Sequence, residues 1–313
     1  MSRMNSSDTD EFEAYRPLMF SIAYRMLSSA TEAEDIVQEA YLRYQAVEPG
    51  QIVSHKAFLS TVVTRLCLNQ LQSARVQRET YIGPWLPEPV LTQADNVSAP
   101  ARQVELHESL SIAFLTLLEQ LTPLERAVFL LREVFDYEYA EIAQIVEKEE
   151  AACRQMFSRA KKHISENRPR FKPNPEAHRH LLDQFIEAVG TGQLDGLMQL
   201  LADDVVMWAD GGGKARGAAL HPLQGRQSVA SFIMASTRFA PEGFSTGLFE
   251  VNGEPAFILR SDSTIIAVLC FTINQGRVSE IRAIGNPDKL EWVSGNRHIV
   301  SYESNDSEEE RLS

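Results

Sequence analysis

The sequence has little cysteine, no long apolar run and no excess of positive charge. Its three cysteines, Cys67, Cys153 and Cys270, are far apart and lie inside apolar patterns, so we expect packed thiols rather than disulfides or metal ligands. The chain has no run of membrane-spanning length and no signal-peptide character at its N-terminus, which predicts a cytoplasmic protein without a membrane partner. It also has no zinc or redox spacing, and we expect no metal and no cofactor.

The net charge of -13 argues against a protein that binds nucleic acid through general electrostatics alone. The charge is uneven, however, because residues 150–172 carry seven Lys/Arg against two Glu. An acidic chain with one basic segment suits contact with DNA at chosen points, with a larger partner to carry it there. The length of 313 residues allows two or three domains with real cores.

Residues 137–164 have the pattern of a helix-turn-helix. The apolar face of the first helix consists of Tyr139, Ile142, Ala143 and Val146, and that of the second consists of Cys153, Met156, Ala160 and Ile164. The outward side chains of the second helix can bind base edges and phosphates. They are Arg154, Gln155, Ser158, Arg159, Lys161 and Lys162. An amphipathic helix with a basic solvated face would give the same pattern.

The predicted turn lacks the usual glycine. Glu147 and Lys148 stand where a positive φ is wanted, which costs a non-glycine residue about 1 kcal/mol. Glu149 and Glu150 suit the N-terminus of the second helix but would repel DNA phosphates. Ahead of this segment, Thr122 as N-cap, Pro123 and Glu125 predict another helix start.

The first part of the chain predicts a helical hairpin over residues 11–46. The helices break at residues 27–30, and Thr31 is the expected N-cap of the second helix with Glu34 as its capping-box partner. One face of that second helix carries an acidic and amide stripe with an outward leucine, which is a candidate docking surface or an ordinary solvated face. The stripe consists of Asp35, Gln38, Glu39 and Leu42.

A third helix is predicted over residues 56–78. Its polar, increasingly basic face includes Arg65, Asn69 and Arg75, and suits a strand of DNA or an ordinary surface equally. The proline-rich stretch that follows cannot be helical over most of its length. Trp85 and Leu86 within it either pack on a neighbouring domain or occupy a groove.

The second half of the chain has helices first and strands after. Two helices precede the strand VVMWAD, a glycine-rich loop, a short helix over residues 227–237 and four strand-like runs, with Asn274, Gln275 and Gly276 as a hairpin turn. This order predicts an α+β cone of the NTF2 type with an antiparallel sheet. Asp210 with His221, or Asp204 with Trp208, could act as acid–base groups. Because no nucleophile, metal set or cofactor loop accompanies them, we expect no enzyme.

Three segments together resemble one family. EAEDIVQEAYLRY resembles the polymerase-docking helix of the sigma-70 superfamily, and residues 56–78 look like its promoter-melting helix. LTPLERAVFLLREVFDYEYAEIAQIVEKEEAACRQMFSRAKK looks like its promoter-reading domain. With only these two domains before residue 170, the chain is similar to the extracytoplasmic-function (ECF) sigma factors over roughly half its length.

Three further motifs, WLPEPV, DGGGK and NPDKL, resemble those of the SigJ-like ECF subgroup with a fused SnoaL-like domain. The resemblance implies that this domain regulates sigma activity in place of a separate anti-sigma protein. A flexible hairpin is the alternative for DGGGK, whose glycines would otherwise let the backbone approach another surface closely. The implied regulatory interface comprises Trp85, Leu86, Pro87, Glu88, Pro89, Asp210, Gly211, Gly212, Gly213, Lys214, Asn286, Pro287, Asp288, Lys289 and Leu290.

The sequence therefore predicts a multidomain protein: two all-α helical sigma domains, sigma2 and sigma4 with its helix-turn-helix, followed by an α+β NTF2/SnoaL-like cone. The expected boundaries are sigma2 at 1–78, the Pro-rich linker at 79–103, sigma4 at 104–170, the SnoaL/NTF2-like domain at 175–295, and an acidic tail at 296–313. We expect this tail to be disordered from Ser301 onward.

The resemblance also assigns roles within a sigma factor that directs core RNA polymerase to promoter DNA. The stripe on the second helix would dock on polymerase, while Arg65, Asn69 and Arg75 would engage the opened minus-ten strand, with the loop from Pro49 to His55 accepting an extruded base. Arg154, Gln155, Ser158 and Arg159 would recognise the minus-thirty-five element, and Lys161 and Lys162 would bind phosphates. Two alternatives stay open: a ligand-sensing DNA-binding regulator that never joins polymerase, and a SnoaL-like enzyme fused to a DNA-binding region. A small-molecule ligand of the C-terminal domain is equally open.

Overall fold

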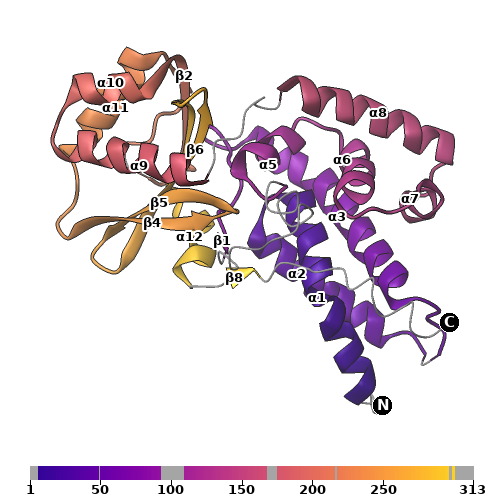
Figure 1. Cartoon of the computed structure of the whole chain (residues 1–313). Helices are drawn as coiled ribbons and strands as arrows, with labels where there is room; N and C mark the ends of the chain where they lie inside the picture. Colours follow the sequence, from indigo (N-terminus) through magenta and orange to yellow (C-terminus); the bar gives the residue numbers. More distant parts are fainter. Residues whose placement is uncertain are drawn as a thin grey trace.

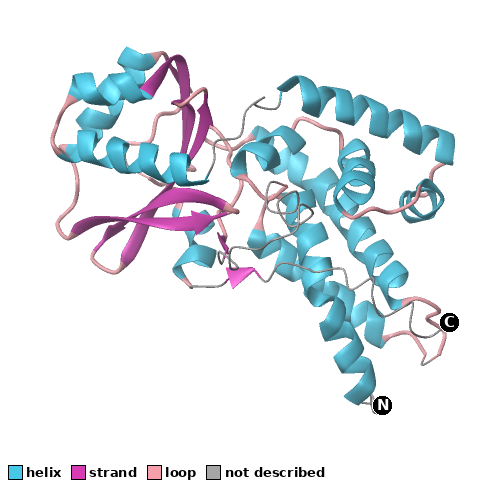
Figure 2. Ribbon diagram, viewed as in Figure 1, coloured by secondary structure: helices cyan, strands magenta, loops and turns pink. Residues whose placement is uncertain are grey.

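The chain folds into a group of helices followed by a sheet-containing region (Figures 1 and 2). The computed structural model describes residues 6–48, 50–92, 109–167, 175–215, 217–295 and 298–299, and describes side chains for these except 6–10, 74–79, 167, 175, 298 and 299. The order confirms the expected fold class, with helical domains first and an α+β region after them. Apart from His298 and Ile299, which form a short strand, the acidic tail lies outside the described residues.

Three helices make up the first part: α1 (Ser6–Leu27), α2 (Ala30–Gln45) and α3 (His55–Glu79). Helix α1 packs against both α2 and α3. The apolar residues Phe12, Leu18, Ile22 and Met26 of α1 are buried, and every residue from Leu18 to Leu27 is buried as well, so this half of the helix is surrounded by other parts of the chain.

Helix α2 begins two residues earlier than the predicted N-cap implies, and Thr31 as its N-cap is wrong. Ser29 is the N-cap instead, because its backbone is extended (φ -132°) and its hydroxyl accepts a hydrogen bond from the Glu32 N–H at 3.1 Å. Glu34, the expected capping-box partner, pairs with Arg16 of α1. The preceding Ser28 takes a positive φ of 58°, so the break between the helices is confined to these two serines.

The second helical part comprises α5 (Ile112–Leu118), α6 (Pro123–Phe129), the π-helical turn η1 (Leu130–Val134), α7 (Tyr139–Val146) and α8 (Glu150–Asn167). Thr122 and Glu125 form the predicted capping box. The turn between α7 and α8 holds Glu147 at φ 54°, which confirms that a non-glycine residue takes the left-handed conformation there. Residue 104, the expected start of this second helical domain, lies outside the described residues.

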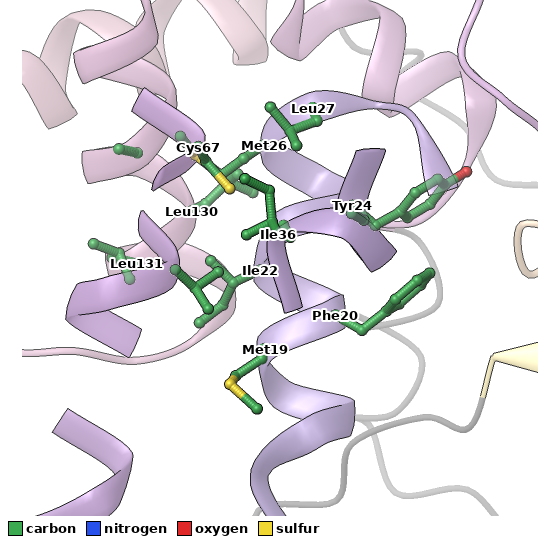
Figure 3. Close-up of a cluster of buried hydrophobic side chains, with 14 of the residues drawn as sticks. Met19, Phe20, Ile22, Tyr24, Met26, Leu27, Ile36, Cys67, Leu130 and Leu131 are labelled. Atoms are coloured by element: carbon green, nitrogen blue, oxygen red, sulfur yellow. The ribbon is translucent and has the colours of Figure 1, made fainter. Parts of the chain in front are cut away.

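Both helical parts share one hydrophobic core. The buried cluster runs without interruption from α1, α2 and α3 to the helix-turn-helix residues Ile142 and Cys153. Figure 3 shows Ile22 and Met26 of α1 together with Leu130 and Leu131 of η1. Separating sigma2 from sigma4 would therefore expose apolar surface on each.

The third part contains α9 (Pro175–Gly190), α10 (Leu194–Leu200), α11 (Arg226–Thr237) and α12 (Pro287–Ser294). Its strands are β2 (Leu201–Asp210), β3 (Leu223–Gln224), β4 (Phe244–Val251), β5 (Glu254–Ser261), β6 (Thr264–Asn274) and β7 (Arg277–Ile284), joined by β1 (Leu91–Thr92) and β8 (His298–Ile299). Asn274–Gly276 form the predicted hairpin turn, with Gln275 and Gly276 at positive φ.

The strand order is β3-β2-β7-β6-β5-β4-β1-β8. The hairpins from β4 to β7 are antiparallel as predicted, but β2 pairs with β7 in parallel and β1 with β8 in parallel, so the sheet is mixed. Helices α9, α10 and α11 cover one face of the sheet. Helix α12, Leu86 and Leu91 of the linker, and Ile112 of α5 pack on the other.

The three cysteines are free and buried, as predicted. Within the described residues, no group of His, Cys, Asp and Glu side chains could hold a metal ion. Among the helices described, none is both long and apolar enough to cross a membrane.

Candidate polymerase, DNA and interdomain surfaces

The candidate docking stripe lies on the outer face of α2. Leu42 is 60% exposed, Asp35 and Gln38 are exposed as well, and Glu39 pairs with Arg43 at 3.1 Å on the same surface. The opposite face of α2 is buried through Ile36, Val37, Ala40 and Tyr44. The stripe is thus open to a partner in this structure.

The candidate recognition helix α8 presents all six predicted DNA-binding side chains to solvent. Its four cations have acidic partners nearby: Arg154 with Glu150 at 2.9 Å, Arg159 with Glu125 at 3.1 Å, Lys161 with Glu133 at 3.0 Å, and Lys162 with Glu166 at 3.9 Å. Ion pairs at such exposed positions contribute about 0 to 1 kcal/mol. Phosphates can therefore replace these carboxylates at little cost.

The candidate melting face of α3 is in contact with the helix-turn-helix. Arg65 donates hydrogen bonds from Nε to the Ile145 carbonyl at 3.0 Å and from Nη2 to the Gln144 carbonyl at 2.9 Å. Its Nη1 also pairs with Glu147 at 3.1 Å. The last carbonyls of a helix lack intrahelical partners, so the Arg65 guanidinium caps the C-terminus of α7. DNA can reach this guanidinium fully only if α7 leaves it.

A groove of about 720 Å³ continues this contact between α3 and the start of α6. Asn69, the second predicted melting residue, lines it opposite Thr122 and Pro123. Arg75 lies further along α3, where side chains are outside the described residues. The loop before α3 is exposed, with Gly50 at positive φ and Val53 fully exposed at its tip, whereas Pro49 is not described.

The linker passes between sigma2 and the C-terminal region, with residues 86–90 buried. Leu86 N–H donates to Asp210 at 2.8 Å, Glu88 N–H to the Ser28 carbonyl at 2.9 Å, and Val90 N–H to Asn252 Oδ1 at 3.0 Å. Pro87 and Pro89 stand between them and have no N–H to satisfy. This alternation explains how the segment is buried without an unpaired amide.

Asp210 and Lys289 form a buried ion pair that holds the linker. The Lys289 ammonium lies 2.7 Å from Asp210 Oδ2, donates to the Leu86 carbonyl, and sits 3.8 Å from the centre of the Trp85 ring. Tyr81 donates its hydroxyl proton to Asp210 as well. Burial, and then this contact with Asp210, raises the pKa of Tyr81, so its hydroxyl stays protonated. WLPEPV, DGGGK and NPDKL thus meet at one point.

The glycines of DGGGK allow close approach to the linker. A Cβ at Gly212 would lie 3.0 Å from the Tyr81 hydroxyl oxygen, and one at Gly213 would lie 2.9 Å from Ile82 Cδ1. Both glycines have positive φ. Lys214, in contrast, is exposed and pairs with Asp288 of the NPDKL motif.

Asn252, at the tip of the β4–β5 hairpin, joins the C-terminal region to both sigma domains. It is fully buried, and its amide donates to the Tyr24 hydroxyl of α1 and to the Leu110 carbonyl just before α5, each at 2.7 Å. Tyr24 in turn donates to the Glu88 carbonyl at 2.6 Å. Nearby, Trp292 of α12 stacks on Phe20 of α1 with ring centres 5.3 Å apart.

Sequence reasoning missed Tyr24, Asn252 and Trp292. Asn-Gly between two strand-like runs does signal a hairpin turn, but nothing in that signal shows that the turn is buried against another domain. Two buried arginines were missed as well. Arg25 donates to Ser109 at 2.9 Å and Arg126 to the Met26 carbonyl at 2.6 Å, and both connect sigma2 to sigma4. Burial lowers the pKa of Arg25 to about 9 and that of Arg126 to about 10.

In each candidate acid–base pair, the structure gives the two residues different surroundings. Asp210 is 1% exposed and bonded to the linker, while His221 is exposed. Asp204 is exposed too, and Trp208 lies under the Arg282 guanidinium at 5.0 Å. Asp210 therefore holds the linker.

Comparisons with known proteins agree with this arrangement. Residues 12–76 match Sigma-70 region 2, and residues 111–164 match Sigma-70, region 4. The ECF RNA polymerase sigma factor SigJ of Mycobacterium tuberculosis is 36% identical over 294 residues, which cover 90% of this chain and 93% of the relative. A probable ECF RNA polymerase sigma factor, SigI, of the same organism is 30% identical over 285 residues, with 90% and 93% covered.

The crystal structure of the Mycobacterium tuberculosis ECF sigma factor SigJ has the same fold, with a TM-score of 0.71 and 33% identity over 90% of this chain and 98% of that one. A helix-turn-helix domain, a second helical domain and a fused α+β cone define a multidomain transcription initiation factor. The chain belongs to the ECF RNA polymerase sigma factors, and as such it directs polymerase to promoters.

Proposed function

We propose that this sigma factor docks on core RNA polymerase through Asp35, Gln38, Glu39 and Leu42 and is regulated in cis by its C-terminal domain. Arg65, Asn69 and Arg75, with the loop from Pro49 to His55, engage the opened minus-ten strand. Arg154, Gln155, Ser158 and Arg159 recognise the minus-thirty-five element, and Lys161 and Lys162 bind phosphates.

One observation carries the regulatory part of the proposal: the docking stripe is exposed while Arg65 is bonded to α7. The minus-ten and minus-thirty-five elements lie about 20 base pairs apart, or roughly 70 Å at 3.4 Å per base pair. Helix α3 and the helix-turn-helix cannot contact both elements while they touch each other. The form described here is ready for polymerase and closed to the promoter.

The C-terminal domain is positioned to hold this closed form. It bonds the linker through Asp210, Lys289 and Asn252, contacts α1 through Trp292, and packs on Ile112 of α5. A domain that touches sigma2, the linker and sigma4 together resists their separation. Its removal therefore changes the free energy needed to open the protein.

In vitro transcription with purified core polymerase tests this proposal. We expect promoter-specific transcripts from the intact chain, and an output that changes after truncation at Asn174. Identical output with and without residues 175–313 would defeat the regulatory role. Tight binding of duplex promoter by the protein alone, with no transcript on adding core polymerase, would instead indicate a regulator that never joins polymerase.

A further inference from the structure

Glu88 of the linker touches the start of the helix that carries the docking stripe. Its carboxylate accepts hydrogen bonds from the Ala30 N–H at 2.8 Å, the Thr31 N–H at 3.0 Å and the Ser29 hydroxyl at 2.8 Å. Glu88 is 9% exposed, so these bonds are sheltered from water. A linker residue thus completes the N-terminal cap of α2.

The Ser29 cap alone leaves other N–H groups in the first turn of α2 without a hydrogen-bond partner. The Ser29 hydroxyl accepts from the Glu32 N–H, and the first N–H groups of a helix have no intrahelical partner. Glu88 satisfies two of those groups and places a negative charge at the positive end of the helix dipole. Asp35, the first residue of the docking stripe, follows five residues after Ala30.

The C-terminal domain fixes Glu88 from both sides. Two residues before it, Leu86 is bonded through its N–H to Asp210 and through its carbonyl to Lys289. Two residues after it, Val90 is bonded through its N–H to Asn252 Oδ1 and accepts from the Asn252 N–H at 2.9 Å. Pro87 and Pro89 stiffen the intervening chain, so these two attachments set the position of Glu88 together with its backbone bonds to Ser28 and Tyr24.

We propose that Glu88 is a detachable N-terminal cap through which the C-terminal domain controls the polymerase-docking helix. This inference rests on the proposed regulation in cis and identifies the contacts through which the C-terminal domain acts on α2. When the C-terminal domain holds Leu86 and Val90, the cap is in place and the first turn of α2 is ordered. When it lets go, the stiff linker takes Glu88 away and that turn frays.

The test is hydrogen exchange of the Ala30 and Thr31 amides in the full-length protein. Glu88→Ala should speed their exchange by roughly 2- to 30-fold, the range expected from loss of a helix cap. Asn252→Gly should speed it too, although Asn252 does not touch α2 and glycine keeps the positive φ of the turn. The double variant should exchange no faster than Glu88→Ala alone, since both changes act through one cap.

Two controls separate this route from general damage. Asp195→Ala removes an exposed carboxylate from the first turn of α10 and should leave the α2 amides unchanged. The amide of Val63, buried in α3, reports whether each variant is folded, and its exchange should stay slow in all of them.

Unchanged exchange at Ala30 and Thr31 in Asn252→Gly, or an equal extra factor when it is added to Glu88→Ala, would overturn the cap mechanism. The proposed function would survive that result if truncation at Asn174 still altered transcription. Conversely, unaltered transcription after truncation would overturn the regulation itself.

Discussion

Helices α2 and α3 are neighbours in one domain, yet the faces that we propose to bind polymerase and promoter are in opposite states. The stripe on α2 faces solvent, with Leu42 exposed and the local Glu39–Arg43 ion pair across it. The proposed DNA-binding face of α3 is bonded through Arg65 to the end of α7. In our proposal this difference sets an order of events, with polymerase bound first and the promoter only after sigma4 moves.

The C-terminal region shows a similar contrast between a buried and an exposed ion pair, each of which joins the DGGGK motif to the NPDKL motif. Asp210–Lys289 is buried and bonds the linker, whereas Lys214–Asp288 is exposed. Burial decides how much each pair matters, because a buried charge that loses its partner stays desolvated. The following predictions test both comparisons, from the largest expected effect to the smallest.

Loss of the buried pair should have the largest effect. Asp210→Ala leaves the Lys289 ammonium buried without its carboxylate, and we expect the free energy of unfolding to fall by about 3 to 5 kcal/mol. The matched change Asp288→Ala should cost no more than about 1 kcal/mol. Urea unfolding of both variants measures the difference, and equal losses would mean that Asp210 is not the essential contact.

A buried histidine should make stability depend on pH. Burial lowers the pKa of His178 on α9 to about 4, below its unfolded value near 6.5. Between these values the unfolded chain binds the extra proton, so stability is complete above pH 6.5 and falls as the pH drops toward 4. The loss due to this pKa shift should reach about 3 kcal/mol.

Comparison of wild type with His178→Phe isolates that contribution from acidic groups elsewhere. The variant should lose less stability than the wild type between pH 6.5 and pH 4 in chemical unfolding. Parallel pH profiles for the two proteins would contradict the assignment.

In the recognition helix, Arg154→Ala should reduce discrimination at one base position by about 1 to 3 kcal/mol. Lys161→Ala should weaken binding to all promoter sequences alike, because a phosphate contact carries no base information. Competition binding of the holoenzyme to single-base promoter variants distinguishes the two. An even loss from both variants would show that their roles are misassigned.

The turn residue Glu147 has two relevant features: its backbone is in the strained left-handed conformation, and its carboxylate pairs with Arg65. Glu147→Gly and Glu147→Ala both remove the carboxylate, but only glycine tolerates the positive φ without cost. The glycine variant should therefore be more stable than the alanine variant by about 1 kcal/mol. Both should bind promoter DNA more readily if the contact between α3 and α7 competes with DNA.

Leu42→Ala should leave stability within about 0.5 kcal/mol of wild type, as expected for a surface change. It should still weaken association with core polymerase in a pull-down assay. Leu220→Ala is the matched control, since Leu220 is 59% exposed against 60% for Leu42 but lies in the C-terminal region. Equal polymerase binding by both variants would remove the docking assignment.

The helices, the cap of α6 and the motifs WLPEPV, DGGGK and NPDKL could be predicted because each depends on residues close together in sequence. The Thr122 capping box and the strained Glu147 are such cases. The misplaced cap of α2 shows the limit of this reasoning. Ser29 and Thr31 both suit an N-cap by residue type, and the serine is the cap where Glu88, distant in sequence, also binds.

Beyond the interface that the family resemblance implies, contacts between distant segments could not be predicted. Tyr24, Asn252 and Trp292 are ordinary core, turn and helix residues by sequence pattern, and only the packing of three regions brings them together. The same holds for Arg65, because a basic residue on a polar helix face suits DNA and the end of α7 equally. Sequence shows which groups can bond, while the fold selects their partners.

The distance between α3 and α8 tests the central claim most directly. Ser73 and Ser165 are exposed on these helices, and the native thiols are buried, so Ser73→Cys and Ser165→Cys can carry spin labels selectively. Addition of core polymerase and promoter should lengthen the distance between the labels toward roughly 70 Å, the spacing of the two promoter elements at 3.4 Å per base pair. A distance that stays at its value in the free protein, in a complex that makes transcripts, would contradict the account.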